Sequence, residues 1–66
     1  MSVARVTEII SASDKSFEDA VKEGIARANQ TLDNIKEAWD AGHKVVVENG
    51  QIVEYRVTLN VTFVLH

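Results

Sequence analysis

The last segment of the chain alternates apolar and polar residues, and this alternation limits the possible folds more than any other feature. From residue 53 to residue 65 every second side chain is apolar, which is the period of a β-strand with one buried face. Asn49 and Gly50 come before it, and this dipeptide favours a type I′ turn between antiparallel strands. Residues 44–48, with three consecutive valines, supply the partner strand. This end of the chain therefore predicts a β-hairpin.

The first half of the chain predicts a strand followed by a helix. Residues 3–10 are rich in β-branched side chains and predict a strand, and residues 11–15 predict a polar turn. Ser16 is typical of a helix N-cap, and Asp19 can complete a capping box with it. Gly24, inside the helix, marks either a close neighbouring backbone or a tolerant position. The apolar stripe of this helix, spaced by three or four residues, is Phe17, Val21, Ile25, Ala28, Leu32 and Ile35.

The predicted order of strand, helix, strand and strand indicates an α+β class. The final strand is the longest and has the most apolar face, so we expect it in the middle of an antiparallel sheet with strand order 1-3-2. The first and second strands would then run parallel to each other, joined by a right-handed crossover through the helix. The helix covers the apolar face of the sheet. The other face is rich in threonine and asparagine and stays open.

The length of the chain predicts association with copies of itself. A domain of 66 residues buries only about 60% of its unfolded surface and is marginally stable alone. The chain has no cysteine and only two histidines, so disulfides and a closed zinc site are excluded. Open strand edges also favour pairing with other copies. A homo-oligomer is the remaining route to stability.

Charge and composition argue against several classes of partner. The formal net charge of −3, from 10 acidic and 7 basic residues, argues against nucleic acid. The apolar runs are too short to span a membrane, and residues 1–5 lack the apolar stretch of a signal peptide, so we expect a cytoplasmic protein. There is no cysteine nucleophile, no glycine-rich phosphate loop and no serine near a histidine in sequence. The sequence therefore does not predict an enzyme.

Four stretches of the chain together resemble the dodecin family. Residues 13–20 resemble the segment that opens the dodecin helix, and residues 26–35 resemble the end of that helix. Residues 48–59 and 61–63 resemble the hairpin and the final strand. The resemblance covers nearly the whole chain without gaps, and residues 1–66 are interpreted as a single dodecin-like domain.

The resemblance implies a β-α-β-β subunit whose sheet wraps partly around its helix. Twelve such subunits assemble into a hollow homo-dodecamer. The family binds flavins (riboflavin, FMN or FAD) or their breakdown products, for storage and protection rather than catalysis. The resemblance therefore implies a cage that sequesters a small aromatic ligand.

The two residues through which dodecins contact flavin differ in this chain. By the resemblance, the stacking tryptophan corresponds to Glu37, and the hydrogen-bonding glutamine corresponds to Arg56. Trp39, two positions after Glu37, would point to the same side of a strand, displaced by about 7 Å. Trp39 either stacks on a ligand or anchors a subunit interface. Glu37 and Arg56 either contact a ligand or form an ion pair that closes the site, which leaves a structural shell as the alternative function.

Asp40 and His43 are the remaining candidates for a site. They are close in sequence, on either side of Gly42, and copies of them brought together by symmetry could hold a divalent cation. The other interpretation is a solvated loop, and no metal ligand is assigned from the sequence. His66 is given no role.

Overall fold

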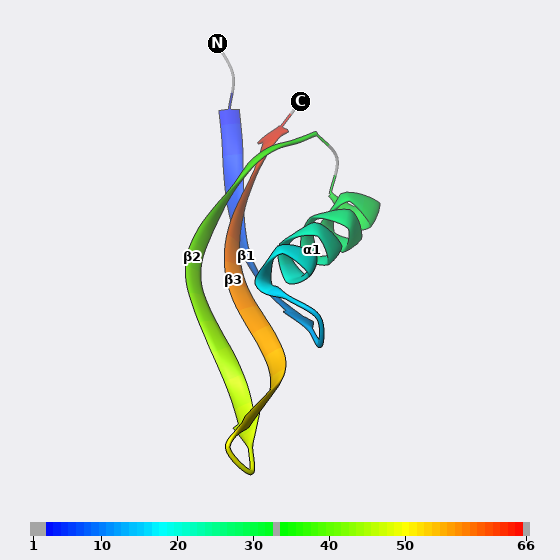
Figure 1. The fold of residues 1–66 in the computed structure, drawn as a ribbon. Helices are drawn as coiled ribbons and strands as arrows, with labels where there is room; N and C mark the ends of the chain where they lie inside the picture. Colours follow the sequence, from blue (N-terminus) through cyan, green and yellow to red (C-terminus); the bar gives the residue numbers. More distant parts are fainter. Residues whose placement is uncertain (1–2, 33, 66) are drawn as a thin grey trace.

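One helix and three strands form the part of the chain that the computed structural model describes, residues 3–32 and 34–65. In chain order they are β1 (Val3–Ser13), α1 (Phe17–Thr31), β2 (Ile35–Glu48) and β3 (Gln51–Leu65). Figure 1 shows a long, twisted sheet with the helix lying obliquely across one of its faces. No helix within residues 3–32 and 34–65 has the length and apolar character needed to cross a membrane.

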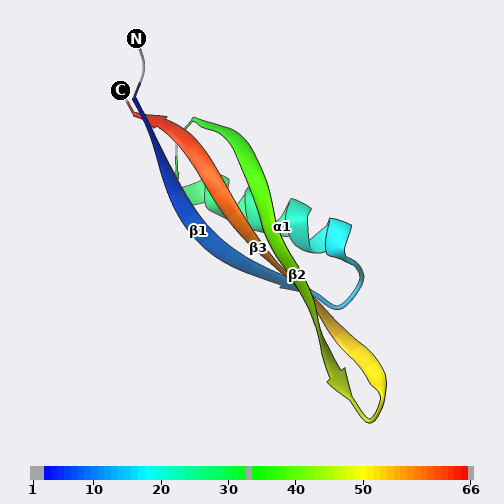
Figure 2. The same ribbon diagram turned by 90° about the vertical axis from the view of Figure 1, so that its left-hand side faces the viewer.

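The predicted topology of the sheet is confirmed. The strand order is β1-β3-β2, and β3 pairs antiparallel with both neighbours. β1 and β2 are therefore parallel to each other, and α1 connects them across the sheet (Figure 2). The central place of β3 follows from its alternation, because the strand with the most apolar face gains most from burial.

The core lies where β3 passes under α1. We call the side of the sheet that packs against α1 the helix face, and the opposite side the outer face. Val57, Leu59 and Val61 on the helix face are at most 1% exposed, and they pack against the fully buried Ala20 of α1. The apolar residues that complete this core are Ile9, Phe17, Val21, Ile25 and Ile35.

The helix ends earlier than the apolar stripe predicts. α1 stops at Thr31, and Leu32 has an extended backbone while its N–H donates to the carbonyl of Ala28. Ile35 is the first residue of β2, not the last turn of the helix. It still packs against the core, so its apolar side chain serves the core from β2 and not from the helix. Residue 33, which the predicted helix included, lies outside the described residues.

β2 is much longer than the five residues predicted for it. It begins at Ile35 instead of residue 44, because pairing with β3 overrides the weak strand propensity of residues 36–41. β1 is also longer and continues to Ser13. Its last three residues, predicted as part of a turn, pair with Val57, Arg56 and Tyr55 of β3.

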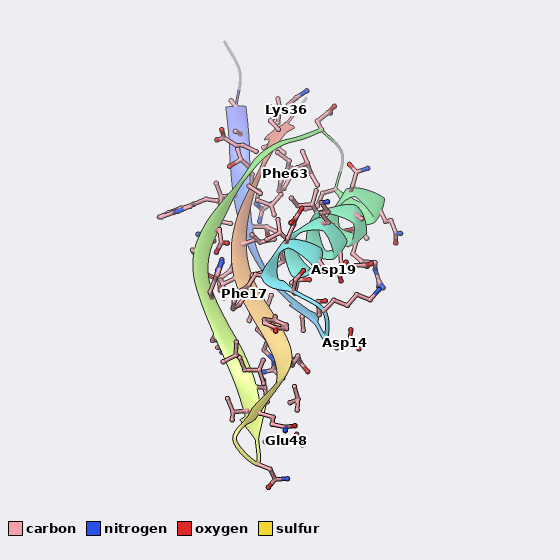
Figure 3. All side chains as sticks on the ribbon, viewed as in Figure 1. Asp14, Phe17, Asp19, Lys36, Glu48 and Phe63 are labelled. Carbon is pink, nitrogen blue, oxygen red and sulfur yellow. The ribbon has the colours of Figure 1, made fainter. Side chains whose placement is uncertain are left out.

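The start of α1 uses the predicted cap with one change. The Ser16 hydroxyl accepts a hydrogen bond from the Asp19 backbone N–H at 2.9 Å, as an N-cap does. The Asp19 carboxylate, predicted to complete a capping box, instead accepts a hydrogen bond from the Ser13 hydroxyl at 2.7 Å. Figure 3 shows Asp19 on the first turn of α1, near the end of β1. This bond ties the helix start to the strand before it.

Gly24 lies where α1 comes closest to β1. A Cβ atom at Gly24 would be 2.9 Å from the Cβ of Ser11 and 3.3 Å from Cδ1 of Leu59. Of the two interpretations of Gly24, the close approach is the correct one. Only a residue without a side chain lets the helix lie this near the sheet.

Candidate functional site

The outer face of the sheet carries the residues that the family resemblance selects. Alternate residues of β3 point to this face, and each has a neighbour on β1 and on β2. Asn60 lies between Glu8 and Trp39, and the next row has Thr62 between Val6 and Glu37. A third row, on the other side of Asn60, has Thr58 between Ile10 and Gly42, and a fourth has Arg56 between Ala12 and Lys44.

Trp39 is the most exposed large apolar residue of this face. Its side chain is 70% exposed, next to the open rows that contain Val6 and Ile10, which are themselves 58% and 65% exposed. Glu37 lies one row away on the same face, as expected for two residues that alternate along a strand. A solvent-exposed indole beside apolar neighbours is an unfavourable surface unless a ligand or another subunit covers it.

Glu37 and Arg56 do not pair within the subunit, so this part of the sequence interpretation is wrong for a single copy. Glu37 is opposite Thr62, whereas Arg56 is opposite Lys44. The six residue steps from Arg56 to Thr62 along β3 separate the two rows by about 20 Å. Arg56 instead donates from Nε to Oε1 of Glu54, two residues earlier on the same face. The separation follows from the register that begins at the Asn49-Gly50 turn, because the register shifts at Val46/Val47 and at Asp40/Gly42 cancel between Glu48 and Glu37.

The surface between Trp39 and Arg56 is open. Along β3 the rows of Asn60 and Arg56 are about 13 Å apart. The row between them contains Gly42, and no neighbouring atom lies within 4 Å of where a Cβ of Gly42 would be. An indole ring therefore borders one side of this surface and a guanidinium group borders the other. Both groups stack on planar aromatic molecules, and the guanidinium also donates hydrogen bonds.

Asp40 and His43 lie in β2 and not in a solvated loop. Oδ1 of Asp40 accepts a hydrogen bond from the Gly42 backbone N–H at 3.2 Å and lies 3.0 Å from Nδ1 of His43. This pair spans a register shift between Asp40 and Gly42. The His43 ring stacks on Phe17 with a centroid distance of 4.3 Å, and Phe17 meets Tyr55 edge-on at 5.1 Å.

These contacts give Asp40 and His43 a structural role within the subunit. They hold the bulge of β2 against the start of α1, where Figure 3 shows Phe17 next to the sheet. Among the residues that the structure describes, no three histidine, cysteine, aspartate or glutamate side chains gather closely enough to hold a metal ion. A cation at Asp40 and His43 would need ligands from other copies.

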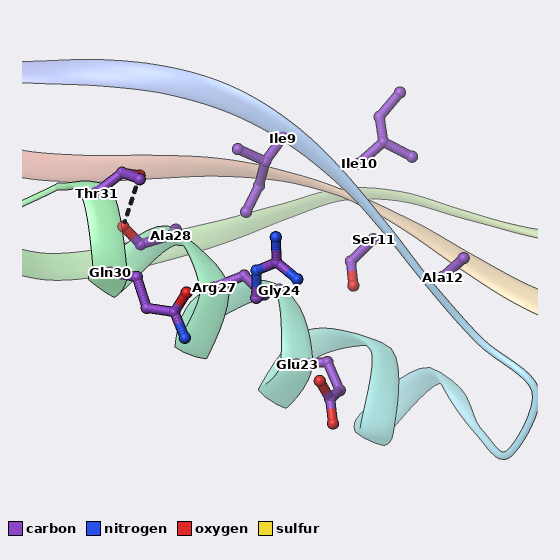
Figure 4. Close-up of a pocket in the computed structure, with 10 residues that line it drawn as sticks. All are labelled: Ile9, Ile10, Ser11, Ala12, Glu23, Gly24, Arg27, Ala28, Gln30 and Thr31. Atoms are coloured by element: carbon purple, nitrogen blue, oxygen red, sulfur yellow. Dashed lines mark hydrogen bonds between the residues drawn. The ribbon is translucent and has the colours of Figure 1, made fainter.

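A groove of about 550 Å³ lies between β1 and α1, and sequence reasoning did not predict it. We call it the edge groove, because β1 is an edge strand of the sheet. Figure 4 shows its two walls. The residues that line it are Ile9, Ile10, Ser11, Ala12, Glu23, Gly24, Arg27, Ala28, Gln30 and Thr31. The sequence signal that could have indicated this groove is the pair of small residues Gly24 and Ala28, four positions apart on one side of the helix, because small residues let another backbone lie close.

The architecture defines a class: a small β-α-β-β subunit with one covered sheet face and one open face that carries an exposed tryptophan. A sequence model of the dodecin family matches residues 3–66, and the chain belongs to this family. A curated relative, calcium dodecin of Mycobacterium tuberculosis, is 35% identical over 63 residues, which cover 96% of this chain and 89% of the relative.

Solved structures of dodecins show the same fold. A dodecin from Streptomyces davaonensis matches with a TM-score of 0.94 at 34% identity and covers 98% of this chain and 96% of its own. The M. tuberculosis calcium dodecin, described as calcium chelating with a novel calcium-binding site, matches with a TM-score of 0.85 at 34% identity. That match covers 97% of this chain and 91% of the relative.

Proposed function

We propose that residues 1–66 form a single-domain, non-catalytic dodecin subunit that assembles with copies of itself and sequesters a small planar ligand. Family membership supports flavin as the ligand class and a hollow homo-dodecamer as the assembly, and we place the protein in the cytoplasm. The observation that carries the ligand part is the exposed indole of Trp39 on the outer face of the sheet. An indole held on a rigid strand is a ready stacking surface for an isoalloxazine ring.

The three residues of the proposed site have different roles. Trp39 supplies the π face that Glu37 lacks. Arg56, which its bond to Glu54 holds on the outer face, donates hydrogen bonds to the polar edge or phosphate of the ligand. Glu37 lies one row beyond Trp39, on the side away from Arg56, and would accept hydrogen bonds from the ligand of a second copy. In this arrangement the ligand lies across the row of Thr58 and Gly42.

Fluorescence quenching of riboflavin tests the ligand proposal. We expect the assembled protein at micromolar concentration to quench added riboflavin. Trp39→Ala is expected to weaken binding at least about fivefold, because an aromatic pair is worth about 1 kcal/mol beyond the area it buries. Lys22→Ala is the matched control, because Lys22 is exposed on α1, where it pairs only with Glu18. Absence of quenching by the unaltered protein would contradict flavin binding.

The same variants separate a ligand role of Trp39 from an interface role. Light scattering measures the mass of the assembly. If Trp39→Ala leaves the mass unchanged and lowers the affinity for riboflavin, Trp39 contacts the ligand. If the variant dissociates into smaller species, Trp39 is an interface anchor. Glu37→Trp combined with Arg56→Gln is expected to strengthen flavin binding, since it restores the side chains that the family resemblance places there.

Calcium is the second candidate ligand, and the name of the M. tuberculosis relative favours it. In this chain Glu8 and Glu37 both lie on the outer face, on either side of β3, with Asn60 and Thr62 between them. Calcium binds six to eight oxygen ligands, some of which are water, and a second copy that shares the ion would supply further carboxylates. Millimolar calcium is expected to raise the melting temperature through binding to the folded state. Glu37→Gln should remove that increase, and an equal increase in the variant would contradict this site.

A further inference from the structure

The turn of the β2–β3 hairpin places an asparagine directly before a glycine, and both Asn49 and Gly50 are exposed. Apart from chain neighbours, no atom of the described residues lies within 4 Å of where a Cβ of Gly50 would be. The backbone nitrogen of glycine is less shielded than that of other residues, because glycine has no side chain. The side-chain amide of Asn49 therefore has an unhindered nucleophile next to it in the chain.

This pair of residues has the groups needed to lose the Asn49 amide without an enzyme. The backbone nitrogen of Gly50, after giving its proton to water, attacks Cγ of Asn49. A bond forms between that nitrogen and Cγ, the bond from Cγ to Nδ2 breaks, and Nδ2 takes up a proton and leaves as ammonia. Water then opens the cyclic imide. Opening at one carbonyl gives aspartate, and opening at the other gives isoaspartate, in which the main chain runs through the former side chain.

The folded turn opposes this reaction. Ring closure requires the Gly50 nitrogen and Cβ of Asn49 to lie on the same side of the Cα–C bond of Asn49. The φ of 54° at Asn49 and of 75° at Gly50 define a type I′ turn, in which ψ of the first central residue is also small and positive. That ψ directs the Gly50 nitrogen away from Cβ. The turn therefore has to open before the amide reacts.

The tip of the hairpin is the part of the sheet with the least support. β1 pairs with β3 only from Tyr55 onward, so residues 51–54 have β2 as their sole neighbour in the described sheet. Figure 1 shows this ribbon extending past both α1 and β1. A two-stranded ribbon without further cover is marginally stable in water. Segments of this kind open locally while the rest of the domain stays folded.

We propose that Asn49 is a site of spontaneous deamidation and that opening of the hairpin tip controls its rate. The product is a carboxylate next to Glu48, and it makes the formal charge of each subunit, −3 in the unmodified chain, one unit more negative. Isoaspartate also lengthens the main chain of the turn, so the pairing of Glu48 with Gln51 loses its register. Because ammonia leaves, the amide is not restored, and the modified fraction grows with the age of the protein.

Peptide mapping of protein incubated at neutral pH tests the site. Trypsin cleaves after Lys44 and Arg56 and releases residues 45–56, in which Asn49 is the only asparagine. Mass spectrometry measures conversion of the amide to an acid, and chromatography separates isoaspartate from aspartate. We expect both acids to accumulate in this peptide.

Asn29 and Asn60 are internal controls in the same digest. Gln30 and Val61 follow them, and a side chain on the following residue hinders the attacking nitrogen. Asn49 is expected to be converted before either of them. Earlier conversion of Asn29 or Asn60 would overturn the assignment of the site.

Incubation in concentrated guanidinium chloride tests whether the turn controls the rate, because the denatured chain has no turn. We expect Asn49 to react at least about tenfold faster there than in the folded protein, since the reactive form is then always populated. Equal rates in the two states would contradict control by the turn. An intact Asn49 amide in the denatured chain would contradict the site itself.

Two matched valine variants separate local opening from unfolding of the whole subunit. Val47 pairs with Ile52 beside the turn, and Val3 pairs with Leu65 at the other end of the sheet. The two valines are 55% and 61% exposed. Val47→Ala is expected to speed conversion of Asn49 in the folded protein about threefold, the size expected for one cross-strand pair, and to leave the denatured rate unchanged. Val3→Ala is expected to change neither rate, and equal acceleration by both variants would overturn control by the hairpin tip.

Discussion

At the scale of single residues, the lack of a side chain at Gly24 sets how closely the helix approaches the sheet. Gly24 of α1 faces Ser11 of β1 at a distance that leaves no room for a methyl group. In an exposed helix, alanine would be favoured over glycine by about 1 kcal/mol. Here packing opposes that preference, because both the helix backbone and the strand are fixed by the core.

Gly24→Ala is expected to destabilise the protein by about 1–3 kcal/mol, the usual range for overpacking. Chemical denaturation at a fixed protein concentration measures the change in the free energy of unfolding. Gly42→Ala is the matched control, because the space around Gly42 is open, and we expect a change there of less than about 0.5 kcal/mol.

Ser11→Gly should rescue Gly24→Ala in part, since it removes the Cβ atom that the new methyl group meets. A double-mutant cycle gives the coupling between the two positions. A stabilising effect of Gly24→Ala, or purely additive changes in the cycle, would contradict the steric interpretation.

At the scale of elements, the hairpin depends on a turn with unusual backbone angles. Asn49 has φ of 54° and Gly50 has φ of 75°, which are the positive values that a type I′ turn requires at both central positions. The turn sets the pairing of Glu48 with Gln51, from which the rest of the ribbon continues.

Gly50→Ala is expected to destabilise the hairpin by about 1–2 kcal/mol, because a residue with a Cβ atom is disfavoured at positive φ. Asn49→Gly is the matched control and should be nearly neutral, since glycine adopts positive φ without strain. Amide hydrogen exchange of residues 45–53 measures the local effect. Equal exchange in the two variants would contradict the assigned turn.

At the scale of the whole molecule, the subunit is elongated and thinly built. Its extents are 51 × 19 × 14 Å, and one sheet face has no cover from the described part of its own chain. The exposed apolar residues on that face and on the hairpin give a second copy surface to bury. Stability of the fold and formation of the assembly are therefore expected to be linked.

The melting temperature should rise with protein concentration, because association stabilises the folded state by mass action. Differential scanning calorimetry across a hundredfold range of concentration, with light scattering at each point, measures this dependence. A melting temperature that is independent of concentration in a protein of monomeric mass would contradict obligate association.

The sequence alone determined the class of the fold and the central place of β3. Alternation over residues 53–65 and the Asn49-Gly50 dipeptide are local signals. They depend on residues that are neighbours in sequence, so they can be recognised without knowledge of the tertiary structure. Trp39 could also be selected as a site candidate from the sequence, because it lies two positions after Glu37, which the family resemblance assigns to flavin stacking. The end of the helix could not be predicted from the sequence, because Leu32 and Ile35 fit the helical spacing although they belong to different segments.

Tertiary structure decided the distances between the site residues and the existence of the edge groove. The separation of Glu37 from Arg56 depends on the pairing register of β2 with β3, which is a relation between two strands and not a property of one segment. The groove is lined by Gly24 and Ala28 of α1 and by residues 9–12 of the edge strand β1, which are separate segments of the chain. Local preference fixes which elements form, whereas packing between distant segments fixes which side chains share a surface.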